Sequence, residues 1–81
     1  MFTPTTSLRK EDLGEYEVRL VLGIMTTAYS TETPPPNTYQ ITVEDKQTGK
    51  TKTTFMSLDH YKEEHYQHAV ENLITEIKNG K

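Results

Sequence analysis

The residues best suited to chemistry lie in one stretch of the chain, where histidine and glutamate recur at helical spacing. His60, Glu64 and His68 fall at positions i, i+4 and i+8, and His65 lies beside them. Imidazole and carboxylate groups can bind zinc, and histidine near a carboxylate can also transfer protons close to neutral pH. Both kinds of chemistry therefore have to be weighed for this stretch.

A metal site or a catalytic site makes demands that this stretch does not meet. Zinc needs three or four ligands that converge on one point, and a straight helix usually supplies two of them. The order Glu64, His65, Tyr66, Gln67, His68 also differs from the His-Glu-x-x-His pattern of metalloproteases. Catalysis needs a pocket that excludes water, which a chain of 81 residues rarely encloses. We therefore predict no metal site, no cofactor and no enzymatic activity.

A second short pattern, Thr48-Gly49-Lys50-Thr51, looks like the end of a phosphate-binding P-loop. The P-loop pattern requires a glycine five residues before Gly49, and this chain has Glu44 there. It also requires a helix after the lysine, where we predict a strand. We interpret the pattern as an ordinary hairpin turn.

The element that positions the histidines is a predicted amphipathic helix over residues 58–78. Its apolar side chains recur on one face with the 3.6-residue period of a helix that packs on a core. These side chains are Tyr66, Ala69, Val70, Leu73 and Ile77, with Ile74 at the border. Ser57 or Asp59 is predicted to cap the helix, and Gly80 lies beyond its end.

Three segments before the helix have the alternating pattern of half-buried strands. The first covers residues 15–29, with Gly23 as a bulge or bend, and residues 30–37 form a proline-tipped loop after it. The second and third cover residues 38–44 and 50–56, joined by a turn at residues 45–49. In the last strand Phe55 is the best core residue, with Thr51 and Thr53 on the same side.

The start of the chain is predicted to carry no strand. Residues 1–6 are interpreted as a flexible lead, although Phe2 could fold back onto an exposed apolar patch. Ser7 is a helix-capping residue, and Gly14 is suited to the position after a helix end. Residues 8–13 are therefore expected to form a helical turn, held by the docking of Leu8 and Leu13.

Together these elements predict one small α+β domain over residues 1–81. Its predicted fold class is a three-stranded antiparallel meander with the C-terminal helix packed on one face. A short N-terminal helical turn is an optional further element of this fold. The chain has no cysteine, so neither disulfides nor thiolate metal sites are available to it. It lacks a secretory start and an apolar run long enough to span a bilayer, so we predict a cytoplasmic protein without membrane contact.

The outward face of the helix is the first candidate surface for a partner. It combines an aromatic side chain with acidic and titrating groups, and tyrosine is favoured at protein interfaces. The residues are Tyr61, Glu64, His65 and His68.

The sheet face away from the helix is the second candidate surface. If this face binds DNA, the bases would be contacted by Arg19, Gln40, Lys52 and Thr54. The phosphates would be contacted by Lys46 and Lys50. The formal net charge of −3 gives little support for nucleic-acid binding. The same face is predicted to hold Val21, Met25 and Met56, which are more apolar than a solvent-exposed surface requires. Homodimerisation through this face or through an edge strand would explain them.

The sequence therefore favours a small non-enzymatic domain that binds another protein, as an inhibitor or adaptor. Its size and style are those of small proteins encoded by phages and mobile elements, which we state as a hypothesis about its origin. The alternative hypothesis is a sheet-face DNA-binding domain of a regulatory or mobile-element protein.

Overall fold

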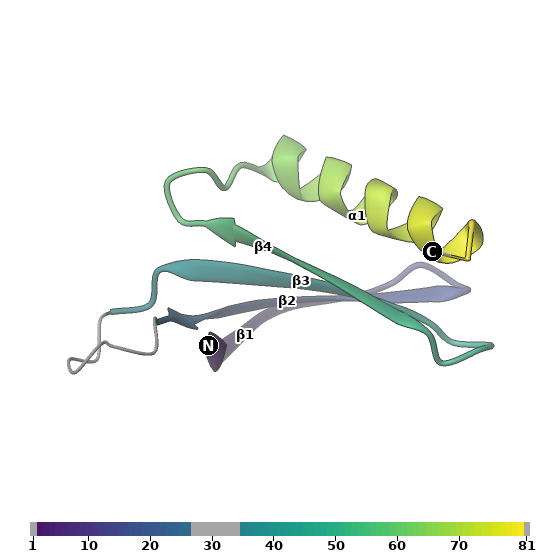
Figure 1. The fold of residues 1–81 in the computed structure, drawn as a ribbon, viewed down its shortest axis with the longest axis horizontal. Helices are drawn as coiled ribbons and strands as arrows, with labels where there is room; N and C mark the ends of the chain where they lie inside the picture. The colour runs from purple at the N-terminus through teal and green to yellow at the C-terminus, as the bar shows by residue number, and fades with distance from the viewer. Residues whose placement is uncertain (1, 27–34, 81) are drawn as a thin grey trace.

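A computed structural model describes residues 2–26 and 35–80 of the chain. The strands form one antiparallel sheet in the order β1-β2-β3-β4, and the helix lies on one side of it (Figure 1). The elements are β1 (Phe2–Asp12), β2 (Tyr16–Met25), β3 (Thr38–Asp45), β4 (Thr51–Ser57) and α1 (Glu63–Lys78). The prediction of an α+β domain with an antiparallel sheet and a C-terminal helix is confirmed, but the sheet has four strands and not three.

The additional strand is β1, which occupies the start of the chain. It pairs with β2 from Phe2 opposite Met25 to Asp12 opposite Glu17, so the residues expected to be a flexible lead belong to the sheet. The predicted helical turn over residues 8–13 is wrong. Both leucines that were expected to dock it remain nearly half exposed. Backbone pairing with β2 therefore fixes this segment, and apolar burial does not.

Two glycines with positive φ close the hairpins. Gly14 has φ 84° in the turn between β1 and β2, where its N–H donates to Asp12 Oδ1 at 2.9 Å. Its left-handed backbone suits a hairpin turn as well as a helix end, which explains the wrong helix prediction. Gly49 has φ 76° and donates its N–H to the carbonyl oxygen of Asp45 at 2.8 Å. The predicted hairpin at residues 45–49 is confirmed.

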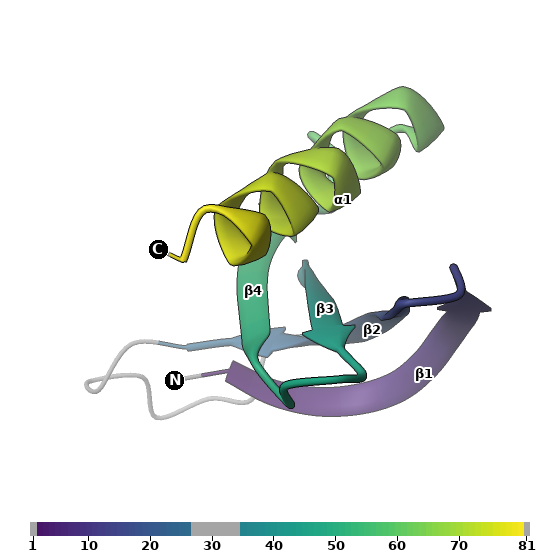
Figure 2. The same cartoon turned by 90° about the vertical axis from the view of Figure 1, so that its right-hand side faces the viewer.

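The extra residues of the sheet lie in β1, and one of them falls beside Gly23 of β2. The β1–β2 register shifts between Pro4 and Thr6 and again between Ser7 and Arg9, and β1 is visibly curved in Figure 2. On its other side β2 pairs with β3 without a break as far as Gly23, so the irregularity predicted at Gly23 is found in the β1–β2 pair, with the extra residue in β1. Extra residues in one strand of a pair bend that strand, which accounts for the curvature of β1.

The core lies between α1 and the two central strands. Val70 and Leu73 of the predicted apolar stripe are buried, as expected from their spacing. Among the described residues, neither β1 nor β4 supplies a fully buried hydrophobic side chain. The buried set is Val18, Leu20, Ile41, Val43, Tyr66, Val70, Leu73 and Ile77.

The helix begins at Glu63, later than predicted. Before it, the N–H groups of His60 and Tyr61 both donate to the carbonyl oxygen of Ser57 at 3.1 Å, forming a turn after β4. Lys62 occupies the N-cap position in an extended conformation and makes no side-chain capping bond, so the predicted caps are wrong. Gly80 lies beyond the helix end with φ 72°, as its position predicted.

The side chains of β4 face the opposite way from the prediction. Thr54 lies opposite Ile41 and Met56 opposite Tyr39, so Thr54 and Met56 are on the helix side. Phe55 points away from the core and is 46% exposed, which contradicts its assignment as a core residue. A strand with an apolar residue on each side gives no unambiguous face, and a choice wrong by one residue reverses every side chain.

Two predictions fall wholly or partly outside the described residues. The proline-tipped loop over residues 30–37 is described only at residues 35–37, which belong to neither a helix nor a strand. The first predicted strand ran to residue 29, whereas β2 ends at Met25.

None of the described helical residues forms a segment long and apolar enough to cross a membrane.

Candidate protein-binding surface

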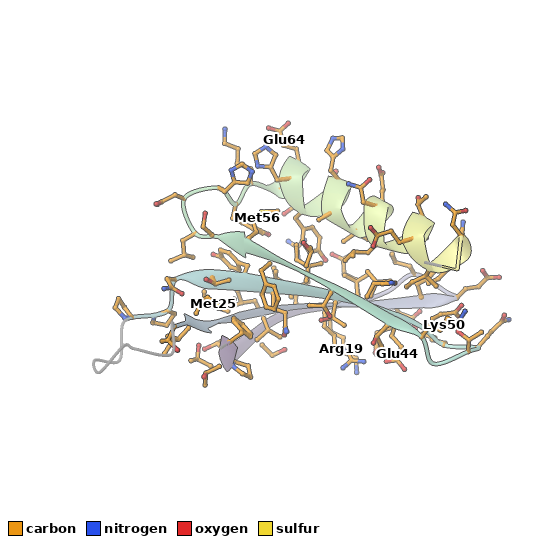
Figure 3. All side chains as sticks on the ribbon, in the orientation of Figure 1. Arg19, Met25, Glu44, Lys50, Met56 and Glu64 are labelled. Atoms are coloured by element: carbon orange, nitrogen blue, oxygen red, sulfur yellow. The ribbon has the colours of Figure 1, made fainter. Side chains whose placement is uncertain are left out.

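The sheet face opposite α1 is the candidate site, and we call it the open sheet face. No part of the described chain lies over it (Figure 1). Arg19 and Glu44 project from it, away from the helix (Figure 3). The register of the four strands places the following side chains on this face: Phe2, Lys10, Glu17, Arg19, Val21, Met25, Gln40, Thr42, Glu44, Thr53 and Phe55.

An aromatic pair marks one end of the open sheet face. The rings of Phe2 and Phe55 lie 5.3 Å apart between centroids and are tilted by 57°. They come from the first and last strands of the sheet, and the Phe2 ring lies over Gly23 of β2. Because Gly23 has no side chain, the ring can lie against the backbone and extend toward β4. Phe2 thus reaches Gly23 and Phe55 as a residue of β1, and not by folding back from a flexible lead.

Charged side chains occupy the other end of the open sheet face. Glu17 forms ion pairs with Lys10 Nζ at 3.2 Å and with Arg19 Nη2 at 3.3 Å, and Arg19 also pairs with Glu44. The hydrogen bond from Lys10 holds the pKa of Glu17 below its usual range, and the positive charges nearby add to this effect. The Arg19 guanidinium is therefore held by two carboxylates of the same face.

The residues predicted to read DNA are divided between two faces of the sheet. Arg19 and Gln40 lie on the open sheet face, whereas Lys52 and Thr54 lie opposite Val43 and Ile41 on the helix side. The structure therefore does not bring the four together.

The two lysines predicted to contact phosphates are also placed differently from one another. Lys46 is paired with Asp12 at 2.6 Å and lowers the pKa of that carboxyl through the hydrogen bond. Lys50 is exposed at the hairpin between β3 and β4 (Figure 3).

The predicted helix face is only partly available to a partner, because Tyr61 packs against the core. Its ring stacks on Tyr39 with centroids 4.3 Å apart and lies 6.4 Å from the Tyr66 ring. Burial raises the pKa of the Tyr61 hydroxyl. The aromatic side chain that motivated this surface therefore lies in the turn before α1 and does not point outward.

The other three residues of the predicted helix face lie within α1. His65 places Nδ1 2.7 Å from the carbonyl oxygen of His60 and stacks on the His60 ring at 4.8 Å. Glu64 and His68 are exposed, and Glu64 points into solvent (Figure 3). In the part of the chain that the structure describes, no group of three histidine, aspartate or glutamate side chains could hold a metal ion.

Two shallow hollows flank α1 on the helix side of the sheet. The hollow beside the outer edge of β4 has a volume of about 290 Å³ and is lined by Thr53, Thr54, Ala69, Asn72, Leu73 and Glu76. The hollow beside the β1–β2 hairpin has about 230 Å³ and is lined by Glu11, Leu13, Tyr66, Gln67, Val70, Glu71 and Ile74. Neither hollow contains a serine or histidine that a carboxylate could activate.

Sequence reasoning did not place Phe2 and Phe55 together on the open sheet face. Phe2 was assigned to a lead without secondary structure, and Phe55 was assigned to the core. The available signal was the threonine-rich alternation around Phe55, in which Met56 is an equally good inward residue. Assigning Met56 to the core would have left Phe55 exposed.

Comparisons of this chain with protein-family models, with curated proteins and with solved structures find no match.

Proposed function

We propose that this chain is a non-enzymatic protein-binding domain that acts as an inhibitor or adaptor, and that it binds its partner through the open sheet face. The observation that carries the proposal is the contact of a partly buried Phe2 with an exposed Phe55 on a sheet face that the described chain leaves uncovered. Aromatic side chains are enriched in protein interfaces, where they supply most of the binding energy from a small area.

The composition of the open sheet face supports a protein partner. Its aromatic end also carries Val21 and Met25, both partly buried, and its middle carries uncharged polar side chains. The ion pairs around Arg19 lie at the far end and form a polar margin. Protein-binding surfaces usually combine apolar side chains with a polar margin, and this face contains both.

The helix face gives less support for partner binding. Tyr61 is held by Tyr39, and His65 is held by His60, so rearranging either would cost existing contacts. Glu64 and His68 remain as exposed polar side chains, which contribute little when they lie at an interface rim.

DNA binding through the sheet remains an alternative proposal. Glu17 and Glu44 lie beside Arg19 and would repel phosphates, and no described contact favours this alternative. DNA binding would be distinguished from protein binding by retention on DNA that falls steeply as the salt concentration rises, because phosphate contacts release counterions. The cytoplasmic location and the origin in a phage or mobile element also stay predictions.

The test compares capture of a partner by three forms of the full chain. Phe55→Ser removes the exposed ring, and Glu64→Ala with His68→Ala removes the exposed groups of the helix face as a matched control. The bait is incubated with nuclease-treated lysate of its native cell, and proteins captured in stoichiometric amount are identified by mass spectrometry.

We expect the wild type and the helix-face control to capture one stoichiometric protein, and Phe55→Ser to lose it. Circular dichroism should show the same helix content in all three forms, since every substituted side chain is at least partly exposed. Capture that survives Phe55→Ser but is lost in the helix-face control would reject the open sheet face. Retention of the wild type on immobilised DNA, measured separately without nuclease and lost at high salt, would favour the DNA-binding alternative.

A further inference from the structure

The outer edge of β4 is a regular strand edge with no strand paired to it among the described residues. β4 contains no proline, and its register with β3 runs without a break. The other edge strand, β1, contains Pro4 and two register shifts, which are features that hinder strand addition. Of the two edges, β4 is therefore the one suited to accept a further strand.

The register shows which backbone groups β4 presents outward. The N–H of Asp45 donates to the carbonyl oxygen of Lys50, and the N–H of Leu58 donates to that of Asn37. Both bonds join residues that lie in the same register as the β3–β4 pairs. Hydrogen-bonded pairs alternate along an antiparallel ladder, so the backbones of Lys52, Thr54 and Met56 face β3. The outward-facing backbone groups are those of Thr51, Thr53, Phe55 and Ser57.

Side chains beside this edge carry opposite charges that have no ion pair in the described structure. Glu76 lines the hollow between α1 and β4, together with Thr54. Lys52 lies on the same side of β4, two residues before Thr54. Within residues 2–26 and 35–80, neither Lys52 nor Glu76 forms an ion pair with another residue.

We propose that two copies of this chain pair through β4, antiparallel about a two-fold axis at Thr53, so that their sheets become continuous. In this register Thr53 of each copy lies opposite the other, and their outward N–H and C=O groups bond to each other. Lys52 of one copy then lies opposite Thr54 of the second copy. Its ammonium group enters the hollow where Glu76 of that second copy provides a carboxylate.

The charge on Lys52 selects this register. A lysine in an edge strand normally opposes strand addition, because pairing would bury its charge without a partner. A shift by one residue would place Lys52 opposite Phe55, whose side chain lies on the other face of the sheet. A shift by two residues would place Lys52 opposite Met56 or opposite Lys52 of the second copy, away from the hollow that contains Thr54 and Glu76. Only the pairing centred on Thr53 places the two opposite charges together.

The position of α1 is compatible with this pairing. The helix packs over β3 and β4, and neighbouring strands are about 4.8 Å apart, so the two helices would lie about 10 Å apart on the same side of the joined sheet. This separation is close to that of packed helices. Ala69 and Asn72 line the side of α1 that faces the second copy, and their side chains are small enough for such an approach.

The inference is independent of the proposed function. Strand pairing uses the edge of β4, whereas partner binding uses the open sheet face, and Phe55 keeps its ring on that face in either state. A dimer that fails to form therefore leaves the partner-capture test unaffected.

The experiment is sedimentation equilibrium of the full chain at a series of concentrations. The variants are Lys52→Glu, Glu76→Lys and the two combined, with Lys50→Glu as a control that makes the same charge change outside the hollow. We expect the wild type and the control to have the mass of two chains. Each single variant should raise the dissociation constant by about tenfold or more, and the double variant should restore most of the affinity.

Two results would overturn the proposed dimer. A wild-type chain that remains monomeric at millimolar concentration overturns the proposal and leaves the edge for an extended segment of a different protein. A dimer whose dissociation constant is unchanged in both single variants places the interface elsewhere and also overturns it. Circular dichroism of each variant shows whether a loss of dimer results from unfolding of the chain or from the change of charge.

Discussion

The guanidinium group of Arg9 lies over the ring of Tyr66, with its central carbon 4.8 Å from the ring centroid. The same group donates to Glu63 at 2.9 Å, and this hydrogen bond is the main reason why the pKa of Arg9 is raised. The Tyr66 hydroxyl donates to Glu11 at 3.1 Å. Strand β1 is thus joined to α1 by polar and cation–π contacts, while the apolar core lies between β2, β3 and α1.

Arg9→Ala is expected to lower the free energy of unfolding by about 1 kcal/mol, because it removes a partly exposed cation–π contact and an ion pair. Urea denaturation followed by circular dichroism measures the change. Lys50→Ala, which removes a cation from the exposed hairpin, should change the stability much less. Equal effects of the two substitutions would mean that the contacts of Arg9 add nothing measurable.

Leu73→Asp is expected to unfold the domain. Leu73 is only 5% exposed at the contact of α1 with the sheet, and a buried carboxylate without a partner adds a desolvation cost to the lost apolar contact. The combined loss of at least about 4 kcal/mol approaches the whole stability of a domain this small. Far-ultraviolet circular dichroism and thermal melting provide the readout, with Gln67→Asp at an exposed position of the helix as the control. A cooperative melt for Leu73→Asp would contradict the packing described.

Gly23→Ala is expected to destabilise the sheet by about 1–3 kcal/mol, the usual range for overpacking. A Cβ at this position would overlap the Phe2 ring and the carbonyl oxygen of Thr3. Adding Phe2→Ala should recover only part of the loss, because the carbonyl oxygen remains. Thermal melts of both single variants and the double variant measure these changes, and an unchanged melting temperature in Gly23→Ala would show that Phe2 does not cover the glycine.

The ion pair between Asp12 and Lys46 is expected to contribute stability that depends on pH. The hydrogen bond from Lys46 lowers the pKa of Asp12 in the folded state. The contribution is therefore complete above the ordinary pKa of an aspartate, near 4, and is lost as the pH falls through the lower folded value. Urea melts of wild type and Lys46→Met should differ at pH 7 and converge in acid. A difference that stays constant over this range would exclude the pair as its source.

Periodicity predicted the central elements because burial determined their sequences. The stripe formed by Tyr66, Val70, Leu73 and Ile77 lies on the core, and the alternation around Val18 and Ile41 marks the two inner strands. The hairpin at Gly49 was predictable from its turn residues, since a positive φ there leaves little choice of residue.

β1 was missed because it supplies no buried hydrophobic side chain to the core. Leu8 and Leu13 are exposed, and Arg9 and Glu11 contact α1 through their polar groups, so the strand lacks an alternating apolar signal. Its backbone bonds to β2 are independent of side-chain type, and a period-based prediction cannot detect them. The aromatic pair of the candidate surface was missed for the same reason, because half of it lies in this strand.

The distribution of the core also determines how the molecule opens. Because the buried side chains come from β2, β3 and α1, the outermost strand β1 can separate without exposing the centre of the domain. Native-state amide exchange should therefore show two classes of protection, with β1 exchanging through a partly opened state and the inner strands exchanging only on global unfolding. In that opened state the ring of Phe2 leaves Phe55. The proposed binding of a partner to the open sheet face would therefore depend on the equilibrium between the paired and the separated states of β1.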